Sequence, residues 1–125
     1  MRDHRQLVAF VKARELALKV YKVTALFPRE EQFGLTSQIR RSAVSVPSNL
    51  VEGCARQSEK DFLRFVDIAL GSARELEFQL DLARQLGFLG ENGDLIELSQ
   101  EVARLVAGLS NAFTKSSRPV GVSRE

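Results

Sequence analysis

The chain has 125 residues, 44% of them hydrophobic and 27% charged, and its formal net charge is +2. These values are typical of one soluble globular domain and argue against a disordered or membrane-spanning chain, since no run approaches the roughly 20 apolar residues of a spanning helix. The single cysteine, Cys54, cannot form an intrachain disulfide, and the charged N-terminus differs from a signal peptide, so we expect a cytoplasmic location.

The first predicted element is an amphipathic helix over residues 6–27. Its apolar positions recur every three or four residues, at Phe10, Ala13, Ala17, Val20, Thr24 and Phe27. A second apolar line makes the apolar arc wider than a lone surface helix requires, and it consists of Leu7, Val11, Leu18, Tyr21 and Ala25. Pro28 disfavours helix at the residue before it, and Gly34 separates this element from the next.

The second predicted element, residues 35–54, keeps a helical apolar period through a proline. Its apolar stripe consists of Ile39, Ala43, Val46 and Leu50. On roughly the opposite side lies a small and polar stripe of Arg41, Ser45, Ser48 and Glu52. Pro47 removes the donor for the carbonyl of Ala43 and crowds that turn, so we predict a kink there, with the helix ending near Gly53.

Two further helices follow. Ser58, three residues before Asp61, resembles the cap that opens a helix, and Gly87 is suited to the left-handed residue that ends it. The N-terminal half of this third helix is apolar on too many sides for one core-facing stripe. The fourth helix has a seven-residue apolar repeat, formed by Leu95, Leu98, Val102, Leu105, Leu109 and Ala112.

These elements predict an all-α fold. Four helices joined by short connections favour an antiparallel up-down-up-down four-helix bundle with a proline-kinked second helix. We assign residues 1–115 to this bundle domain. Residues 116–125 lack any apolar period and are predicted to be a disordered tail.

The sequence contains few of the residue patterns that enzymes use for catalysis or for binding metals and phosphates. His4 is the only histidine and lies near a terminus, so a histidine-based triad is not expected. The Glu-x-x-His pairs of di-iron bundles and the phosphate-binding glycine loop are both missing from the sequence. Three acidic residues at the start of the fourth helix, Glu91, Asp94 and Glu97, are explained by the helix dipole. We therefore predict no catalytic, metal or cofactor site, and we interpret Cys54 as a buried apolar residue.

Charge is distributed unevenly along the chain. Residues 1–57 hold ten Lys and Arg against five Asp and Glu, whereas residues 58–115 hold six against ten. A basic half can face nucleic acid, or it can face the acidic half of a neighbouring subunit in a head-to-tail ring. The candidate phosphate contacts are Arg40, Arg41, Lys12, Lys19 and Lys22, and a solvated or interface-pairing role is the alternative for all five.

The polar stripe of the second helix has a structural interpretation. Arg41 and Glu52 are eleven residues apart, about 16 Å along a helix, so they cannot pair with each other. Glu52, beside Gly53, is expected to pair with an arginine of another helix or subunit. The small residues Ser45 and Ser48, with Ser42 and Asn49, permit another helix to approach closely.

Several motifs resemble one known family. They are GLTSQIRRSAVSVPSNLVEG at residues 34–53, FLRF at 62–65, ALGSARELE at 69–77 and KAREL at 12–16. Together they resemble the bacterial four helix bundle family, whose members are often called 23S rRNA intervening-sequence proteins. The resemblance extends to about residue 89, and Phe10 stands where many relatives carry a tryptophan.

The resemblance implies a bacterial, non-enzymatic protein whose relatives assemble as pentameric rings. Some relatives are encoded within insertions in large-subunit ribosomal RNA genes, and a related accessory protein of retroelements binds nucleic acid. Two functional hypotheses follow. In the first, the oligomer binds RNA through Arg40, Arg41 and the lysines of the first helix. In the second, it is a protein-interaction scaffold, and the basic half is used in subunit contacts.

Overall fold

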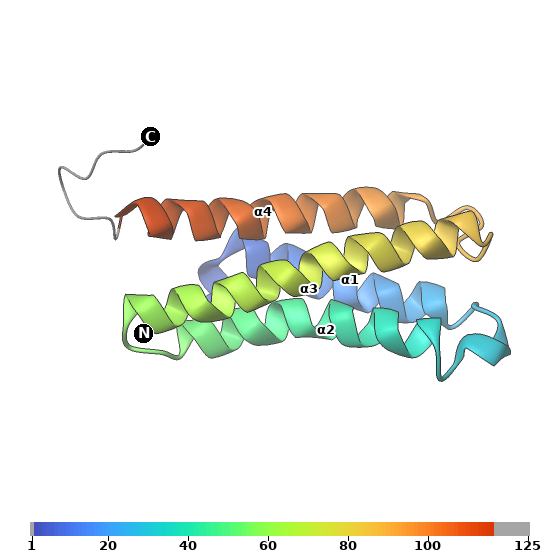
Figure 1. Ribbon diagram of the computed structural model, residues 1–125, viewed down its shortest axis with the longest axis horizontal. Coiled ribbons are helices and arrows are strands. Elements are labelled where there is room, and N and C mark those ends of the chain that lie inside the picture. The colour runs from blue at the N-terminus through green and yellow to red at the C-terminus, as the bar shows by residue number, and fades with distance from the viewer. Residues whose placement is uncertain (1, 117–125) are drawn as a thin grey trace.

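The computed structural model describes residues 2–116, which form four long helices and no strand. The helices are α1 (Val8–Thr24), α2 (Leu35–Cys54), α3 (Glu59–Gln85) and α4 (Asp94–Ser116), with short 3-10 turns at His4–Gln6 and Arg29–Glu31. The four helices lie side by side, and consecutive helices run in opposite directions (Figure 1). The predicted all-α four-helix fold is confirmed. The predicted tail at 116–125 lies outside the described residues, except that Ser116 ends α4.

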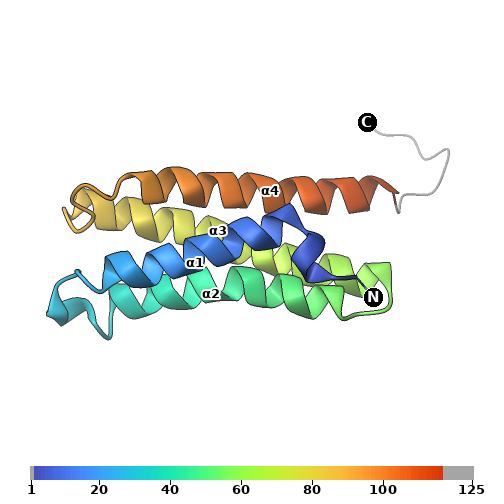
Figure 2. The same ribbon diagram turned by 180° about the vertical axis from the view of Figure 1, so that it is seen from behind.

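Each helix packs against two others. Helix α2 contacts α1 and α3, and α4 contacts the same two helices from the other side (Figures 1 and 2). Within residues 2–116, the backbones of α1 and α3 are not adjacent, and neither are those of α2 and α4. Helices α1 and α3 therefore occupy opposite corners of the bundle, and their outer faces are separate surfaces.

The core between the helices is apolar and closely packed. The whole apolar stripe predicted for α2 is buried, from Ile39 to Leu50. The largest fully buried side chains come from every helix and the loop before α4, and include Leu16, Val20, Ile39, Leu50, Phe62, Leu76, Leu80, Leu89 and Val102. No helix among the described residues has the length and apolar character needed to cross a membrane.

Helix α1 is shorter than the predicted range of 6–27. Its N-terminal side is occupied by a 3-10 turn that Asp3 caps, its carboxylate accepting a hydrogen bond from the Arg5 N–H. The helix ends at Thr24, because Pro28 disfavours helix before it. Phe27 is nevertheless buried, and its ring lies 5.5 Å from that of Phe88 in the loop after α3.

Helix α2 continues through Pro47 to Cys54 without interruption. A proline inside a helix removes only the one backbone hydrogen bond that its missing N–H would donate, here to Ala43, and burial of the apolar stripe stabilises the helix on both sides of it. The kink at Pro47 stays a prediction.

The predicted ends of α3 are confirmed. The Ser58 hydroxyl accepts a hydrogen bond from the Asp61 N–H at 3.0 Å, which satisfies one free donor of the first turn. At the other end, Gly87 has a φ of +83°, and the next N–H, of Phe88, donates to the carbonyl of Ala83 at 2.9 Å. This is the Schellman arrangement, in which the left-handed residue favours glycine.

The seven-residue repeat of α4 is buried only over its first half. Leu95, Leu98 and Val102 lie in the core, whereas Ala112 is exposed. A straight helix has 3.6 residues per turn, so a seven-residue repeat drifts by about 20° per repeat. Further along α4, Val106 therefore forms part of the buried side, and Phe113 packs against the core.

Candidate functional site

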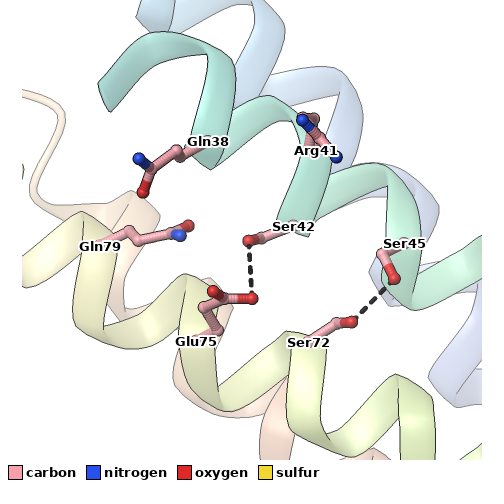
Figure 3. A pocket seen from close by; sticks show the side chains of 7 residues that line it. All are labelled: Gln38, Arg41, Ser42, Ser45, Ser72, Glu75 and Gln79. Carbon is pink, nitrogen blue, oxygen red and sulfur yellow. Dashed lines mark hydrogen bonds between the residues drawn. The ribbon is translucent and has the colours of Figure 1, made fainter. Parts of the chain in front are cut away.

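A polar groove runs between α2 and α3 on the outside of the bundle. Its volume is about 320 Å³, and it is lined by Gln38, Arg41, Ser42 and Ser45 from α2 and by Ser72, Glu75 and Gln79 from α3 (Figure 3). The groove exists because residues 38, 41, 42 and 45 share one side of α2, at helical spacing, and that side is polar.

Short hydroxyl contacts join the two walls of the groove. The hydroxyls of Ser45 and Ser72 are 2.7 Å apart, and the Ser42 hydroxyl donates to the Glu75 carboxylate at 3.4 Å. The Asn49 amide donates to the backbone carbonyl of Ser45 at 2.8 Å. Ser42 and Ser45 therefore face α3, as their small size predicts, whereas Ser48 is exposed and takes no part in these contacts.

One polar atom in the groove is not satisfied. Gln79 is buried, with 4% of its surface exposed, and its Oε1 has no hydrogen-bond partner among the residues that the structure describes. Its side chain extends from α3 toward Gln38 and Ser42 across the groove (Figure 3). Buried acceptors in proteins are nearly always paired, because a lost hydrogen bond to water has to be replaced. The groove therefore has unused capacity to bind a donor group.

Helices α2 and α3 also approach each other closely at Gly53. A Cβ atom at this position would lie 3.0 Å from the Cβ of Phe65 and 3.2 Å from the carbonyl oxygen of Phe62. At these distances even a methyl group would require its neighbours to shift by a few tenths of an ångström, and a larger side chain would clash. Gly53 is required by helix packing, and its φ is not in the left-handed region.

The other flank of α2, against α1, is closed by Arg40. Its Nε donates to the Thr24 hydroxyl at 2.8 Å, and its Nη2 donates to the Tyr21 carbonyl at 3.3 Å. The guanidinium also lies 4.5 Å from the centre of the Tyr21 ring. Arg40 thus links α1 to α2, and its guanidinium is already engaged within the chain.

The three predicted lysines of α1 lie on its α4 side. Lys12 forms ion pairs with Glu15 at 3.9 Å and with Glu101 of α4 at 4.0 Å, and Lys19 pairs with Glu15 at 3.3 Å. Lys22 is exposed beside the start of α4, near Asp94.

The five predicted phosphate contacts therefore do not form one patch. Arg40 lies between α1 and α2, Arg41 borders the α2–α3 groove, and the lysines lie along α1 and α4. Sequence spacing could not reveal this, because the separation depends on how each helix is rotated about its axis.

We predicted that Glu52 pairs with an arginine of another helix or subunit, but its partner lies nearby in the sequence. Glu52 accepts a hydrogen bond from Arg56, four residues on, at 2.7 Å. Residues four apart at a helix end are neighbours, so the pair forms locally. Arg41, by contrast, is exposed and has no ion-pair partner among residues 2–116.

Cys54 is buried at the end of α2, as predicted. Burial raises the pKa of its thiol above the ordinary value of 9.0, because the charged thiolate would lose its hydration. No group of three or more His, Cys, Asp or Glu side chains between residues 2 and 116 is placed to hold a metal ion.

Glu75 and Gln79 of α3 are not among the predicted site residues. A signal for Gln79 was present, because it lies at helical spacing between Leu76 and Ala83 on the buried side of α3. A polar residue inside an apolar stripe needs a partner, and the sequence does not show whether the chain supplies one.

Comparison with known proteins agrees with the fold. The family model described as 23S rRNA-intervening sequence protein matches residues 5–111. The crystal structure of a protein of unknown function from the S23 ribosomal protein family of Bacteroides thetaiotaomicron is similar, with a TM-score of 0.74 and 26% identity. The similarity covers 83% of this chain and 96% of that one. No curated protein matches the chain.

Proposed function

The chain belongs to the 23S rRNA-intervening sequence protein family, and from this premise we propose that it acts as a non-enzymatic homo-oligomer that binds RNA. A pentameric ring is the assembly that the resemblance implies. The observation that carries the proposed assembly is the apolar surface exposed on α1 and α3, two helices whose backbones are not adjacent.

These two faces support self-assembly. The exposed large apolar side chains include Val8, Val11, Leu18 and Tyr21 on α1 and Ile68, Phe78 and Leu82 on α3. Monomeric proteins rarely expose extended apolar patches, and such patches mark interaction sites. Because the faces lie at opposite corners of the bundle, contact between unlike faces would join subunits head to tail, as in a ring. The basic character of residues 1–57 and the acidic character of residues 58–115 favour the same pairing.

Binding to RNA would use the phosphate backbone. The sequence pI is about 9.0, and Lys22 and Arg41 are exposed cations without an ion pair among the described residues. In a ring, each such cation would be repeated once per subunit. Phosphate contacts of this kind are independent of base sequence and sensitive to salt.

One observation favours the alternative of a protein-interaction scaffold without nucleic-acid binding. Three of the five predicted phosphate contacts already have partners within the chain: Arg40 contacts Thr24 and Tyr21, and Lys12 and Lys19 form ion pairs. The basic charge would then serve subunit contacts.

Two measurements separate these functions. Light scattering gives the mass of the assembly, and fluorescence anisotropy compares a ribosomal RNA fragment with a random RNA between about 50 and 200 mM salt. We expect an oligomer whose affinity for both RNAs falls steeply with salt. The double variant Lys22→Ala with Arg41→Ala should lower the salt slope by about 1.4 for every subunit that contacts the RNA, at roughly 0.7 for each lost contact to a single strand.

The control removes the same charge from the acidic half. Lys60→Ala with Arg104→Ala changes two exposed basic residues of α3 and α4 and should leave RNA affinity close to that of the wild type. An oligomer that binds neither RNA would favour the scaffold. A monomer at all concentrations would contradict the proposed assembly.

A further inference from the structure

One exposed stripe along α1 is regular and contains a single charge. Residues 11, 14, 18, 21 and 25 follow each other at steps of three and four, and all five are exposed; we call Val11, Arg14, Leu18, Tyr21 and Ala25 the α1 stripe. This is the spacing of a coiled-coil seam. Arg14 lies over the Phe10 ring at 5.3 Å and has no ion pair among residues 2–116.

The exposed face of α3 has the same design with the opposite charge. Residues 68, 71, 75, 78 and 82 also follow steps of three and four, and all are exposed; we call Ile68, Gly71, Glu75, Phe78 and Leu82 the α3 stripe. Its single charge, Glu75, forms no ion pair within the described part of the chain and receives only the 3.4 Å contact from Ser42.

The α3 stripe borders the groove that holds the unsatisfied acceptor. Glu75 belongs to both the stripe and the groove, and Gln79 Oε1 lies one helical turn further along α3 (Figure 3). A carboxylate and an amide oxygen at this spacing both accept hydrogen bonds. A guanidinium, which carries five N–H donors and no acceptor, is suited to bind both.

We propose that Arg14 of a second copy of the chain completes this groove, with its α1 stripe packed along the α3 stripe and its guanidinium bound by Glu75 and Gln79. The inference rests on the self-assembly proposed above and names its contact. Each stripe has a single charge in an apolar seam, and one polar residue in such a seam fixes register. The contact joins the α1 stripe of one subunit to the α3 stripe of the next, so each subunit in the assembly would form two such contacts, one through each stripe.

A competing donor lies in the same groove. Arg41 is on the α2 rim and could turn toward Glu75, which would satisfy the groove within one chain. The two arginines are distinguished by their neighbours at helical spacing. Arg14 lies between the apolar residues Val11 and Leu18, which match the α3 stripe, whereas Arg41 lies between the polar residues Gln38 and Ser45.

Charge reversal tests the pairing. Arg14→Glu and Glu75→Arg should each weaken subunit association at least about 30-fold in a dilution series followed by native mass spectrometry, and the double variant should recover most of the loss. Both positions are exposed, so circular dichroism should show an unchanged helical fold. Arg104→Glu, the same kind of change on α4 away from both stripes, should leave association intact, and Arg41→Ala should weaken association less than Arg14→Glu does.

Cross-linking tests the contact directly. A mixture of an Arg14→Cys chain and a Glu75→Cys chain should give covalent dimers with a short bismaleimide, and neither variant alone should do so. The native Cys54 is buried and gives little background. Cross-links from Arg14→Cys alone would reveal contact between like faces and overturn the inference.

The outcomes separate this inference from the proposed function. A wild-type oligomer that tolerates both charge reversals, or dissociates equally with Arg41→Ala, overturns the Arg14 contact and leaves the assembly standing. Dissociation by both single reversals without recovery in the double variant also overturns the pairing. A wild-type monomer overturns both proposals.

Discussion

Helix α2 has two flanks that differ in how their polar groups are satisfied. On the α1 flank, Arg40 donates to Thr24 and to the Tyr21 carbonyl and stacks on the Tyr21 ring. On the α3 flank, within residues 2–116, Gln79 Oε1 is buried without a hydrogen-bond partner, and Glu75 receives a single long hydrogen bond, from Ser42. The α1 flank is therefore complete within one chain, whereas the α3 flank has hydrogen-bonding capacity that a single chain does not use.

This difference indicates where a partner is to be expected. Both flanks are built from the same helix and both contain charged and hydroxyl side chains, so composition does not distinguish them. What distinguishes them is whether donors and acceptors meet. A buried polar network with an unpaired acceptor destabilises an isolated subunit. Binding of a hydrogen-bond donor from a partner would remove this destabilisation.

The largest expected effect comes from the close packing on the α3 flank. Gly53→Val should lower the free energy of unfolding by about 3 kcal/mol, because its side chain would clash with Phe65 and with the Phe62 carbonyl. Urea denaturation at a fixed protein concentration measures the change. Gly108→Ala on α4, where nothing lies within 4 Å, is the control and should stabilise by up to about 1 kcal/mol. Equal effects at the two glycines would contradict the packing role of Gly53.

The next effect concerns the complete flank. Arg40→Ala should destabilise the protein by about 2 kcal/mol, since it removes two hydrogen bonds from a charged donor and a contact with the Tyr21 ring. Arg41→Ala, its neighbour outside that network, should change stability by less than about 0.5 kcal/mol in the same urea experiment. If the two variants behaved alike, the distinction between the flanks would fail.

On the α3 flank of α2, we expect a substitution to raise the free energy of unfolding, by a smaller amount than the losses above. Gln79→Met keeps the size of the side chain and removes the unsatisfied acceptor, so it should stabilise the isolated subunit by about 1 kcal/mol. The comparison is best made with Arg14→Glu present in both proteins, so that association does not add to the measured stability. A loss of stability would mean that the amide of Gln79 is already satisfied in the subunit.

The smallest effect lies at Cys54, where α2 ends. Since burial raises the pKa of this thiol above 9.0, the folded state holds the proton more tightly than the unfolded state does. The contribution of the Cys54 thiol to the free energy of unfolding is therefore constant at neutral pH. It falls as the pH rises above 9.0, because the thiol then ionises more readily in the unfolded state. The stability difference between wild type and Cys54→Ala should narrow by less than about 1 kcal/mol between pH 7 and pH 10, measured by urea denaturation. A constant difference would indicate an accessible thiol.

Much of the fold could be predicted from local patterns. The stripe from Ile39 to Leu50 is buried, Ser58 caps α3, and Gly87 adopts the left-handed conformation, because each depends on residues close in sequence. The candidate site was predicted less well. Arg40 was predicted to contact phosphate or, alternatively, to be solvated or paired at an interface, and the structure shows it donating to Thr24 and to the Tyr21 carbonyl of α1.

The sequence by itself determined the four helices, both ends of α3 and the core-facing stripe of α2, because hydrophobic period and capping act within a few residues. It also contained the second apolar line of α1, whose exposed members, together with Arg14, form the α1 stripe. Only the tertiary structure decided that Arg40 is engaged, that Gln79 lacks a partner and that the basic residues are separated. These properties depend on which helices are neighbours and how each is rotated about its axis, and no local pattern specifies either.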